Sequence, residues 1–548
     1  MGTKNYDSAT DLITFSRASG GTALSKISYG NNLVTNGTFD TDLSGWTTDT
    51  EWVYSNGKAA LPANAQPNRS LSSTKAYVKL GKTYRVRFDA STSVGTPVNT
   101  SMKLRIWGND NGTGAFIYNG NYINTGSNEI FLSPTANGYM SFDNVISNSF
   151  DKFIDNVSIE EVLFDQADGT LQVYNHPNNV PRIEYDATGA VKGLLIEEAR
   201  TNIVTYSNDF TTSSWTRHRV SIASNVSGVT APDGSETVDK MIPDSTSQEH
   251  RVWDGVSSTA VGETYSVYAK SAGYDYVWLG YYEGSVYGYA VVNLTNGVVT
   301  ASNTANYSVE ASTNGFYRIS VTKTASGTNP RYISISPSPT ASPTLNSSNV
   351  PYFVGDGTSG IYVWGAQIEA GAFLTSYIPT SGSSATRAAD VATIPTSAFG
   401  YNQKVGSVLF EGKVIKANIG TTIDRRFVEI SDGTTTNFIS VYQDVSVDQN
   451  LRIANVDAGV LSVNADTGYT LSDAQTFKLA IGIKLNNFAV SVDGGAVVAD
   501  TTATVSNTLS QIDIGKLGGG TQYLNGHIKS IKYYPRRLTN TQLQELTT

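Results

Sequence analysis

The side chains in this sequence that most clearly suggest a chemical function are aromatic residues spaced two apart on predicted strands. In the segment 274–282, the two-residue period of a strand gives one face four rings: Tyr274, Tyr276, Trp278 and Tyr282. A return strand would extend that face with Tyr287 and Tyr289. Aromatic faces pack on the C–H groups of sugars while polar neighbours bond the hydroxyls, so the pattern predicts carbohydrate binding. An ordinary sandwich core or a packing face between subunits would produce the same pattern.

A second group of aromatic residues lies nearer the N-terminus and suits the same chemistry. This group contains Trp52, Tyr54, Trp107, Tyr118 and Tyr122. A sandwich core or a subunit packing face would explain it equally well. The predicted carbohydrate-binding residues of the whole chain are therefore Trp52, Tyr54, Trp107, Tyr276, Trp278 and Tyr282.

Catalytic motifs are scarce, and we predict no enzyme. The chain has no Cys, which excludes a thiol nucleophile, a disulfide framework and cysteine-based zinc or iron–sulfur sites. No two of its 4 His are four residues apart, so a zincin motif is absent, and no G-x-S-x-G elbow occurs. The adjacent pairs Glu160-Glu161 and Glu197-Glu198 would point to opposite faces of a strand and could not flank one glycosidic bond. Two carboxylates brought together only by folding would escape this reading, so a polysaccharide depolymerase stays an alternative.

Composition points to an almost wholly β protein that binds neither nucleic acid nor a membrane interior. The 548 residues are poor in Lys, Glu, Leu and Met and rich in Thr, Val, Tyr, Gly, Asn and Ser, which suit strands and turns. A net charge of −9, from 38 basic and 47 acidic residues, argues against tracking a phosphate backbone. No run of about 18 apolar residues occurs, so nothing is predicted to span a membrane.

Short alternating strands must position these side chains. Residues 82–89 alternate strictly, with Tyr84, Val86 and Phe88 on one face, and residues 477–484 alternate in the same way. One helix is predicted at the C-terminus, where Thr539 and Gln542 form a capping box. Regular short strands separated by turns indicate an all-β chain of stacked β-sandwiches.

An internal repeat supports a division into domains. The block 32–40 leads to Trp46 and the block 202–210 leads to Trp215, and each opens a long β region. The third region lacks Trp, and a Ser/Thr/Ala-rich stretch precedes it. We predict an N-terminal segment, an inserted jelly roll, a connecting segment, a second jelly roll, a linker and a C-terminal sandwich, over residues 1–32, 33–162, 163–202, 203–378, 379–395 and 396–548.

Several segments resemble known modules. Residues 15–22, 180–186, 193–202 and 377–390 resemble a recurring module of tailed-bacteriophage fibre and head-spike proteins, here split by an inserted domain. The inserted region 33–162 resembles jelly-roll carbohydrate-binding modules, and the C-terminal region resembles concanavalin-like or laminin-G-like lectin domains. These resemblances imply two jelly-roll sandwiches followed by a concanavalin-like sandwich.

The resemblance also implies a setting and a metal. It implies a virion surface protein (a tail fibre, head fibre, spike or capsid decoration) made in the host cytoplasm. Such a protein would bind host-surface polysaccharide for attachment and contact other virion proteins, as a homo-oligomer with a trimer favoured. Jelly-roll sugar-binding modules often hold a structural Ca²⁺ where the opening strand meets the closing one, and Asp40 and Asp155 match those positions. Asp40 could equally cap a turn, and a purely structural head- or tail-attached protein is the alternative role.

Overall fold

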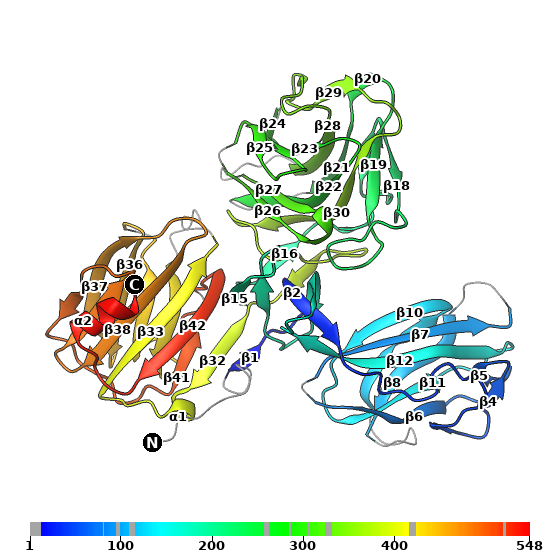
Figure 1. The fold of residues 1–548 in the computed structure, drawn as a ribbon, viewed down its shortest axis with the longest axis horizontal. Coiled ribbons are helices and arrows are strands. Elements are labelled where there is room, and N and C mark those ends of the chain that lie inside the picture. Colours follow the sequence, from blue (N-terminus) through cyan, green and yellow to red (C-terminus); the bar gives the residue numbers. More distant parts are fainter. Residues whose placement is uncertain are drawn as a thin grey trace. The chain divides into compact units, whose positions relative to one another are not determined.

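The computed structural model describes residues 13–80, 82–94, 99–108, 116–256, 262–283, 286–304, 306–323, 331–415, 424–445, 447–518 and 522–548. The chain forms two compact units (Figure 1). Residues 26–170 make up one unit, and residues 171–548 with the N-terminal stretch up to Ser25 make up the other. The inserted domain predicted from the sequence lies inside the first unit.

The predicted all-β fold class is confirmed. Strands dominate the described residues and pair in antiparallel sheets, and the α-helices are α1 (Thr396–Phe399) and α2 (Asn540–Leu546). Helix α2 begins at the predicted capping box, where Thr539 accepts from the Gln542 backbone N–H and Gln542 bonds back to Thr539. No helix in the described ranges is long and apolar enough to cross a membrane.

The unit of residues 26–170 is the first sandwich. One sheet orders its strands as β3 (Trp46–Thr48), β6 (Arg69–Val78), β11 (Gly138–Asn144), β8 (Asn99–Trp107) and β9 (Phe116–Asn124). The facing sheet contains β10 (Gly126–Leu132), β7 (Tyr84–Thr92), β12 (Lys152–Phe164), β5 (Lys58–Leu61) and β4 (Val53–Ser55). The core between them draws on both sheets, as Tyr84, Val86 and Phe88 of β7 pack with Leu104 and Phe142. The strands β2 (Gly21–Tyr29) and β13 (Thr170–His176) carry the chain between the two units.

The second sandwich pairs two six-stranded sheets. The first sheet runs β17 (Thr216–His218), β21 (Arg251–Val256), β28 (Arg331–Ser338), β23 (Tyr276–Glu283), β24 (Val286–Asn293) and β25 (Val299–Ser302). The second runs β18 (Val220–Ala223), β19 (Asp239–Pro243), β30 (Gly360–Ala370), β22 (Glu263–Ala272), β27 (Tyr317–Lys323) and β26 (Tyr307–Ala311). The short pair β20 (Ser247–Glu249) and β29 (Tyr352–Val354) and the 3₁₀ turn η2 (Thr313–Gly315) complete it.

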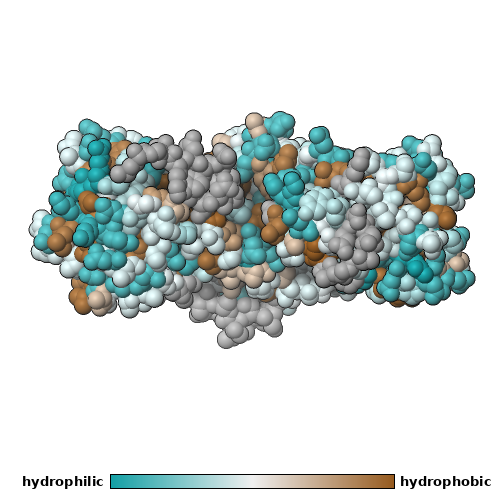
Figure 2. Space-filling model, turned by 90° about the horizontal axis from the view of Figure 1, so that it is seen from below, coloured by the Kyte–Doolittle hydropathy of each residue, from teal (hydrophilic) through white to brown (hydrophobic). Residues whose placement is uncertain are grey.

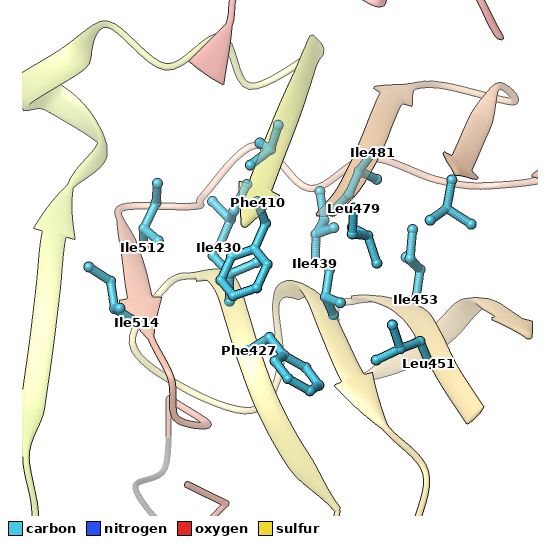
Figure 3. Packing of buried hydrophobic residues seen from close by; sticks show 14 of the residues in the cluster. Phe410, Phe427, Ile430, Ile439, Leu451, Ile453, Leu479, Ile481, Ile512 and Ile514 are labelled. Atoms are coloured by element: carbon cyan, nitrogen blue, oxygen red, sulfur yellow. The ribbon is translucent and has the colours of Figure 1, made fainter. Parts of the chain in front are cut away.

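The C-terminal sandwich has two seven-stranded sheets around one core. The first sheet runs β1 (Thr14–Ser16), β32 (Val391–Pro395), β41 (Gln511–Ile514), β34 (Arg425–Ser431), β35 (Phe438–Gln443), β36 (Asn450–Asp457) and β37 (Val460–Thr470). The second runs β14 (Ile183–Tyr185), β15 (Val191–Ile196), β42 (Gly526–Tyr534), β33 (Val405–Val414), β38 (Thr476–Lys484), β39 (Phe488–Val492) and β40 (Val498–Asp500). Figure 3 shows Phe410 and Leu479 of one sheet packing toward Ile430 and Ile439 of the other.

The two sequence blocks that form the internal repeat make the same contacts in their sandwiches. Asn32 Oδ1 accepts the backbone N–H groups of Val34 and Ile159, and Asn202 Oδ1 accepts those of Val204 and Ile368. The indole N–H of each following tryptophan donates to a backbone carbonyl of its block: Trp46 to Asn36 at 3.0 Å and Trp215 to Tyr206 at 2.9 Å. Each block therefore fastens the opening loop of its sandwich to the closing strand.

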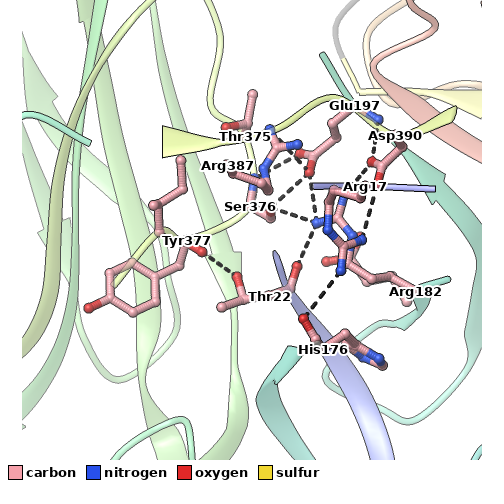
Figure 4. Close-up of polar contacts among 12 residues, drawn as sticks. Arg17, Thr22, His176, Arg182, Glu197, Thr375, Ser376, Tyr377, Arg387 and Asp390 are labelled. Carbon is pink, nitrogen blue, oxygen red and sulfur yellow. Dashed lines mark hydrogen bonds and ion pairs between the residues drawn. The ribbon is translucent and has the colours of Figure 1, made fainter. Parts of the chain in front are cut away.

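A buried cluster of charged side chains joins chain segments far apart in sequence (Figure 4). We name it the hub, and it consists of Arg17, Arg182, Glu197, Arg387 and Asp390. Asp390 accepts from Arg17 Nη1 at 3.1 Å and from Arg182 Nη2 at 2.5 Å, and all three side chains are fully buried. Glu197 contacts Arg182 at 3.0 Å and Arg387 at 3.5 Å. Burial would raise the pKa of Glu197, but Arg387 and Arg182 hold it at about 2.

Residues 379–395, which the sequence suggests as a linker, have a structural role in the hub. This segment contains β31 (Ala385–Arg387), which pairs with β16 (Arg200–Asn202), and it contains the whole of β32, which lies between β1 and β41 in a sheet. It also supplies Arg387 and Asp390 to the hub. The Ser/Thr/Ala-rich composition suggested a linker. The sequence did not reveal the structural role because the buried partners of these two charges lie about 190 or more residues away.

Candidate functional site

Surface hydropathy alone does not single out a site. On the face drawn in Figure 2, described hydrophobic residues are scattered in small groups among hydrophilic ones. A ligand site therefore has to be sought in the arrangement of particular side chains. The strongest arrangement lies on the first sandwich, on the sheet that contains β6, β11, β8 and β9.

Strand alternation sorts the side chains of this sheet between core and outer face. On β8, Met102, Leu104 and Ile106 are buried in the core, so Lys103, Arg105 and Trp107 point the other way. On β11, Met140 and Phe142 enter the core, and the outer positions are Tyr139, Ser141 and Asp143. The register of β11 and β8 then fixes which outer side chains are neighbours.

Three aromatic residues are cross-strand neighbours on three adjacent strands, and we name them the aromatic row. Tyr139 is the cross-strand partner of Tyr77 on one side and of Trp107 on the other. The rings of Tyr77 and Tyr139 lie 5.0 Å apart between centroids. Tyr77 is 39% exposed, and Tyr139 and Trp107 are half-buried. This aromatic row presents apolar ring surface next to polar groups.

A buried ion pair holds Trp107 from a position four residues beyond Tyr139 on β11. Asp143, 1% exposed, accepts from Trp107 Nε1 at 2.9 Å, from Ser141 Oγ at 2.6 Å and from Arg105 Nη1 at 3.3 Å. Arg105 Nε donates to Asn119 Oδ1 at 3.0 Å. The indole is therefore held by its N–H to a carboxylate that is itself fixed by two further donors.

A lysine and a tyrosine complete the surface. Lys103 is the cross-strand partner of Asp143 on β11 and of Tyr122 on β9. Its Nζ lies 4.7 Å from the centroid of the Tyr122 ring, which is a cation–π distance, and Tyr122 is 40% exposed. We name the whole surface the aromatic face, which consists of Tyr77, Lys103, Arg105, Trp107, Tyr122, Tyr139 and Asp143.

The aromatic face has the chemistry that sugar recognition needs. Rings fixed in a row can pack on the C–H faces of successive sugar units, and charged or amide groups beside them can bond hydroxyls. The rings lie on paired strands, so a rigid sheet sets their spacing and little order has to be gained on binding.

The structure separates the three candidate residues that the sequence suggested in the first sandwich. Trp107 lies on the aromatic face. Trp52 is 4% exposed within the core, so its ring is enclosed by core side chains. Tyr54 is 42% exposed but lies on β4, in the opposite sheet, where its hydroxyl donates to the Asp40 carbonyl at 3.1 Å.

In the second sandwich the predicted aromatic face exists but is largely filled. Trp278 is fully buried, stacks on Tyr289 at 5.9 Å and packs with Val350 from a loop. Tyr276 and Tyr282 are half-buried members of the same cluster. Tyr274, which the alternation placed on this face, instead packs against the main core, since it precedes the first residue of β23.

Several residues of interest had no sequence signal strong enough to select them. Tyr77 and Tyr139 are ordinary strand tyrosines until the register of β6, β11 and β8 brings them beside Trp107. In the second sandwich, half-buried Trp253 lies under the Arg251 guanidinium at 4.5 Å. The alternation of residues 138–144 could have put Tyr139 and Asp143 on one face, but not next to Trp107.

The loop that carries Asp40 meets the strand that carries Asp155, the two predicted calcium ligands. Val157 N donates to Gly37 O at 2.9 Å, so the loop that carries Asp40 does meet the closing strand that carries Asp155. Asp40 accepts from Thr38 Oγ1 at 3.0 Å, as a turn residue would. Within the described ranges, no group of three or more His, Cys, Asp or Glu side chains could hold a metal ion. Calcium at Asp40 and Asp155 would need mainly backbone and water oxygens, and it stays a prediction.

Comparisons with known proteins return structural similarities only. No protein-family model matches the chain, and no curated protein matches it. Among solved structures, the CBM40 module of a Ruminococcus gnavus IT-sialidase, bound to α2,6 sialyllactose, is 10% identical with a TM-score of 0.24, covering 28% of this chain and 87% of that one. Domain 4 of the arabinanase AbnA from Geobacillus stearothermophilus, in complex with arabinotriose, is 14% identical with a TM-score of 0.23, covering 32% and 82%. Sheep galectin-11, in complex with glycerol, is 11% identical with a TM-score of 0.20, covering 26% and 95%. Since these matches cover less than a third of the chain at such scores, the function has to be inferred from the chain's own side chains.

Proposed function

We propose that this chain is a non-catalytic carbohydrate-binding protein that contacts a glycan through the aromatic face of its first sandwich. The observation that carries the proposal is the row of Tyr77, Tyr139 and Trp107 across three paired strands, with the indole N–H of Trp107 bonded to buried Asp143.

The second sandwich supplies a further, weaker contact in this proposal. The half-buried rings of Tyr276 and Tyr282 border a filled aromatic cluster and offer edges rather than a full row. Two sugar contacts on one chain, repeated in an oligomer, would raise overall avidity even if each contact is weak.

We also propose the setting that the sequence resemblance implies, a tailed-phage virion protein that attaches to host-surface polysaccharide. Support comes from the hub, where Arg17, Arg182 and Asp390 bind one another. These residues come from three of the separate segments that resemble pieces of one phage fibre module, so the pieces meet as parts of one module would. Trimeric assembly, a place on the virion and the absence of catalysis belong to the same proposal.

Polysaccharide binding by the full chain tests the function. On an array of bacterial surface polysaccharides, we expect selective binding that Trp107→Ala and Tyr139→Ala each weaken by about tenfold, equivalent to about 1.4 kcal/mol. Tyr54→Ala is the control, because Tyr54 is a surface tyrosine, 42% exposed, on the opposite sheet of the same sandwich. It should bind as the parent does.

Three outcomes would overturn the proposal. Absence of binding to every polysaccharide, with retention of the protein on purified phage particles, would favour a structural role. Release of new reducing ends from a bound polysaccharide would identify a depolymerase. Equal loss of binding in Tyr54→Ala and Tyr139→Ala would place the binding surface elsewhere.

A further inference from the structure

The charges of the aromatic face do not cancel. Arg105 and Asp143 neutralise each other at 3.3 Å and are both buried. Lys103 forms no ion pair with a carboxylate in the described part of the chain, and its close contact is the Tyr122 ring. The face therefore carries a net positive charge, although the whole chain has a net charge of −9.

The neighbours of Lys103 leave its ammonium available to a ligand. On one side, the carboxylate of Asp143 is already occupied by Trp107, Ser141 and Arg105. On the other side, the Tyr122 ring attracts the ammonium through its π face but accepts no conventional hydrogen bond. The N–H donors of Lys103 can thus turn to a ligand oxygen while the ring steadies the charge.

The distance between Lys103 and the Tyr77–Tyr139 ring pair sets the kind of ligand. Tyr139 pairs with Trp107 and Asp143 pairs with Lys103, so the ring pair lies four strand positions, about 13 Å, from Lys103, and the Trp107 indole reaches along the strand to Asp143. A single sugar cannot both pack on the tyrosine pair and reach the ammonium at this separation, whereas an oligosaccharide can. A negative group on the glycan would lie away from the ring-stacked sugar.

We infer that the aromatic face selects an acidic polysaccharide, with a sugar carboxylate bound by Lys103 and a neighbouring part of the same chain packed on the row of Tyr77, Tyr139 and Trp107. This inference rests on the proposed function and names its substrate class. The occupant is chosen by charge complementarity, since a carboxylate neutralises the Lys103 ammonium, whereas the hydroxyls of a neutral glycan only hydrogen-bond it.

Matched pairs of polysaccharides test the inference. Each uronate-containing polysaccharide is compared with its carboxyl-reduced form, which keeps the backbone and removes the charge. We expect the full chain to bind at least one acidic member about tenfold or more tightly than its reduced form. We expect Lys103→Met to lose that preference and Lys103→Arg to retain it. Lys58→Met, on the opposite sheet of the same sandwich, is the matched control and should behave as the parent does.

The outcomes separate this inference from the proposed function. Equal binding to acidic and reduced forms, or binding only to neutral glycans, would overturn the inference and leave carbohydrate binding intact. Equally tight binding to dextran sulfate and polyglutamate would also overturn it, because charge alone would then explain the binding. Failure to bind any carbohydrate would overturn the proposed function itself.

Discussion

Replacing Asp390 with asparagine removes the carboxylate that two buried guanidinium groups share in the hub. The substitution keeps the shape of the side chain but leaves Arg17, Arg182 and Arg387 with Glu197 as the remaining hub carboxylate. Hydrogen bonds to charged groups contribute roughly 1.5–3 kcal/mol each, and breaking a buried pair costs roughly 3–5 kcal/mol. Asp390→Asn should therefore lower the free energy of unfolding of this region by about 4 kcal/mol.

Hydrogen exchange followed by mass spectrometry can measure this loss region by region. A chain of several sandwiches need not unfold in one transition, so a single global value would mix them. Peptides from residues 171–202 and 376–395 should exchange roughly a thousandfold faster where exchange reports the opening equilibrium. Peptides from residues 26–170 should exchange as in the parent chain and serve as the internal control.

A surface carboxylate supplies the matched variant. Asp209 is exposed and bonds only within its own turn, so Asp209→Asn should change stability by less than about 0.5 kcal/mol. A change below 1 kcal/mol in Asp390→Asn would refute the reasoning, because it would mean that Arg17 and Arg182 do not depend on Asp390.

Three further predictions concern acid stability, packing and calcium. The folded-state pKa of Glu197 is about 2 against an ordinary 4.5, so its stabilising contribution is complete above pH 4.5 and is lost as the pH falls toward 2. Urea titrations should show a pH dependence between pH 4.5 and 2 that is smaller in Glu197→Gln than in the parent by up to about 3 kcal/mol, while Glu184, whose pKa is also about 2, contributes equally in both; identical acid profiles would contradict the assignment. Gly37→Ala would place a Cβ 2.0 Å from a carbonyl oxygen of β12 and should cost about 1–3 kcal/mol, whereas Gly108→Ala meets nothing within 4 Å; equal melting temperatures would be inconsistent with the packing. If calcium binds, it should raise the melting temperature of the first sandwich and Asp155→Asn should abolish the rise, whereas no shift with calcium or a chelator would rule the site out.

Local pattern was enough to predict much of the fold. The alternation of residues 82–89 placed Tyr84, Val86 and Phe88 in a core, where all three are at most 2% exposed. The capping box at Thr539 and the repeated opening blocks also have the roles expected of them, because each depends on contacts within a short segment or on one paired strand.

The binding face depended on information that no single segment holds. Strand register placed Tyr77 and Tyr139 beside Trp107, and a one-residue slip would have put those rings in the core. Trp278 had the right alternation and the right residue type, but a loop carrying Val350 covers it. The hub likewise depends on Asp390 meeting Arg17 across more than 370 residues of chain.

Residue-resolved protection by ligand tests the central claim most directly. The full chain is exposed to hydroxyl radicals with and without the polysaccharide it binds, and oxidation is quantified by mass spectrometry. We predict protection of Tyr77, Tyr139, Trp107 and Tyr122, with unchanged oxidation of Tyr54 on the opposite sheet. Protection of Tyr54 with no change at the aromatic row would contradict the account.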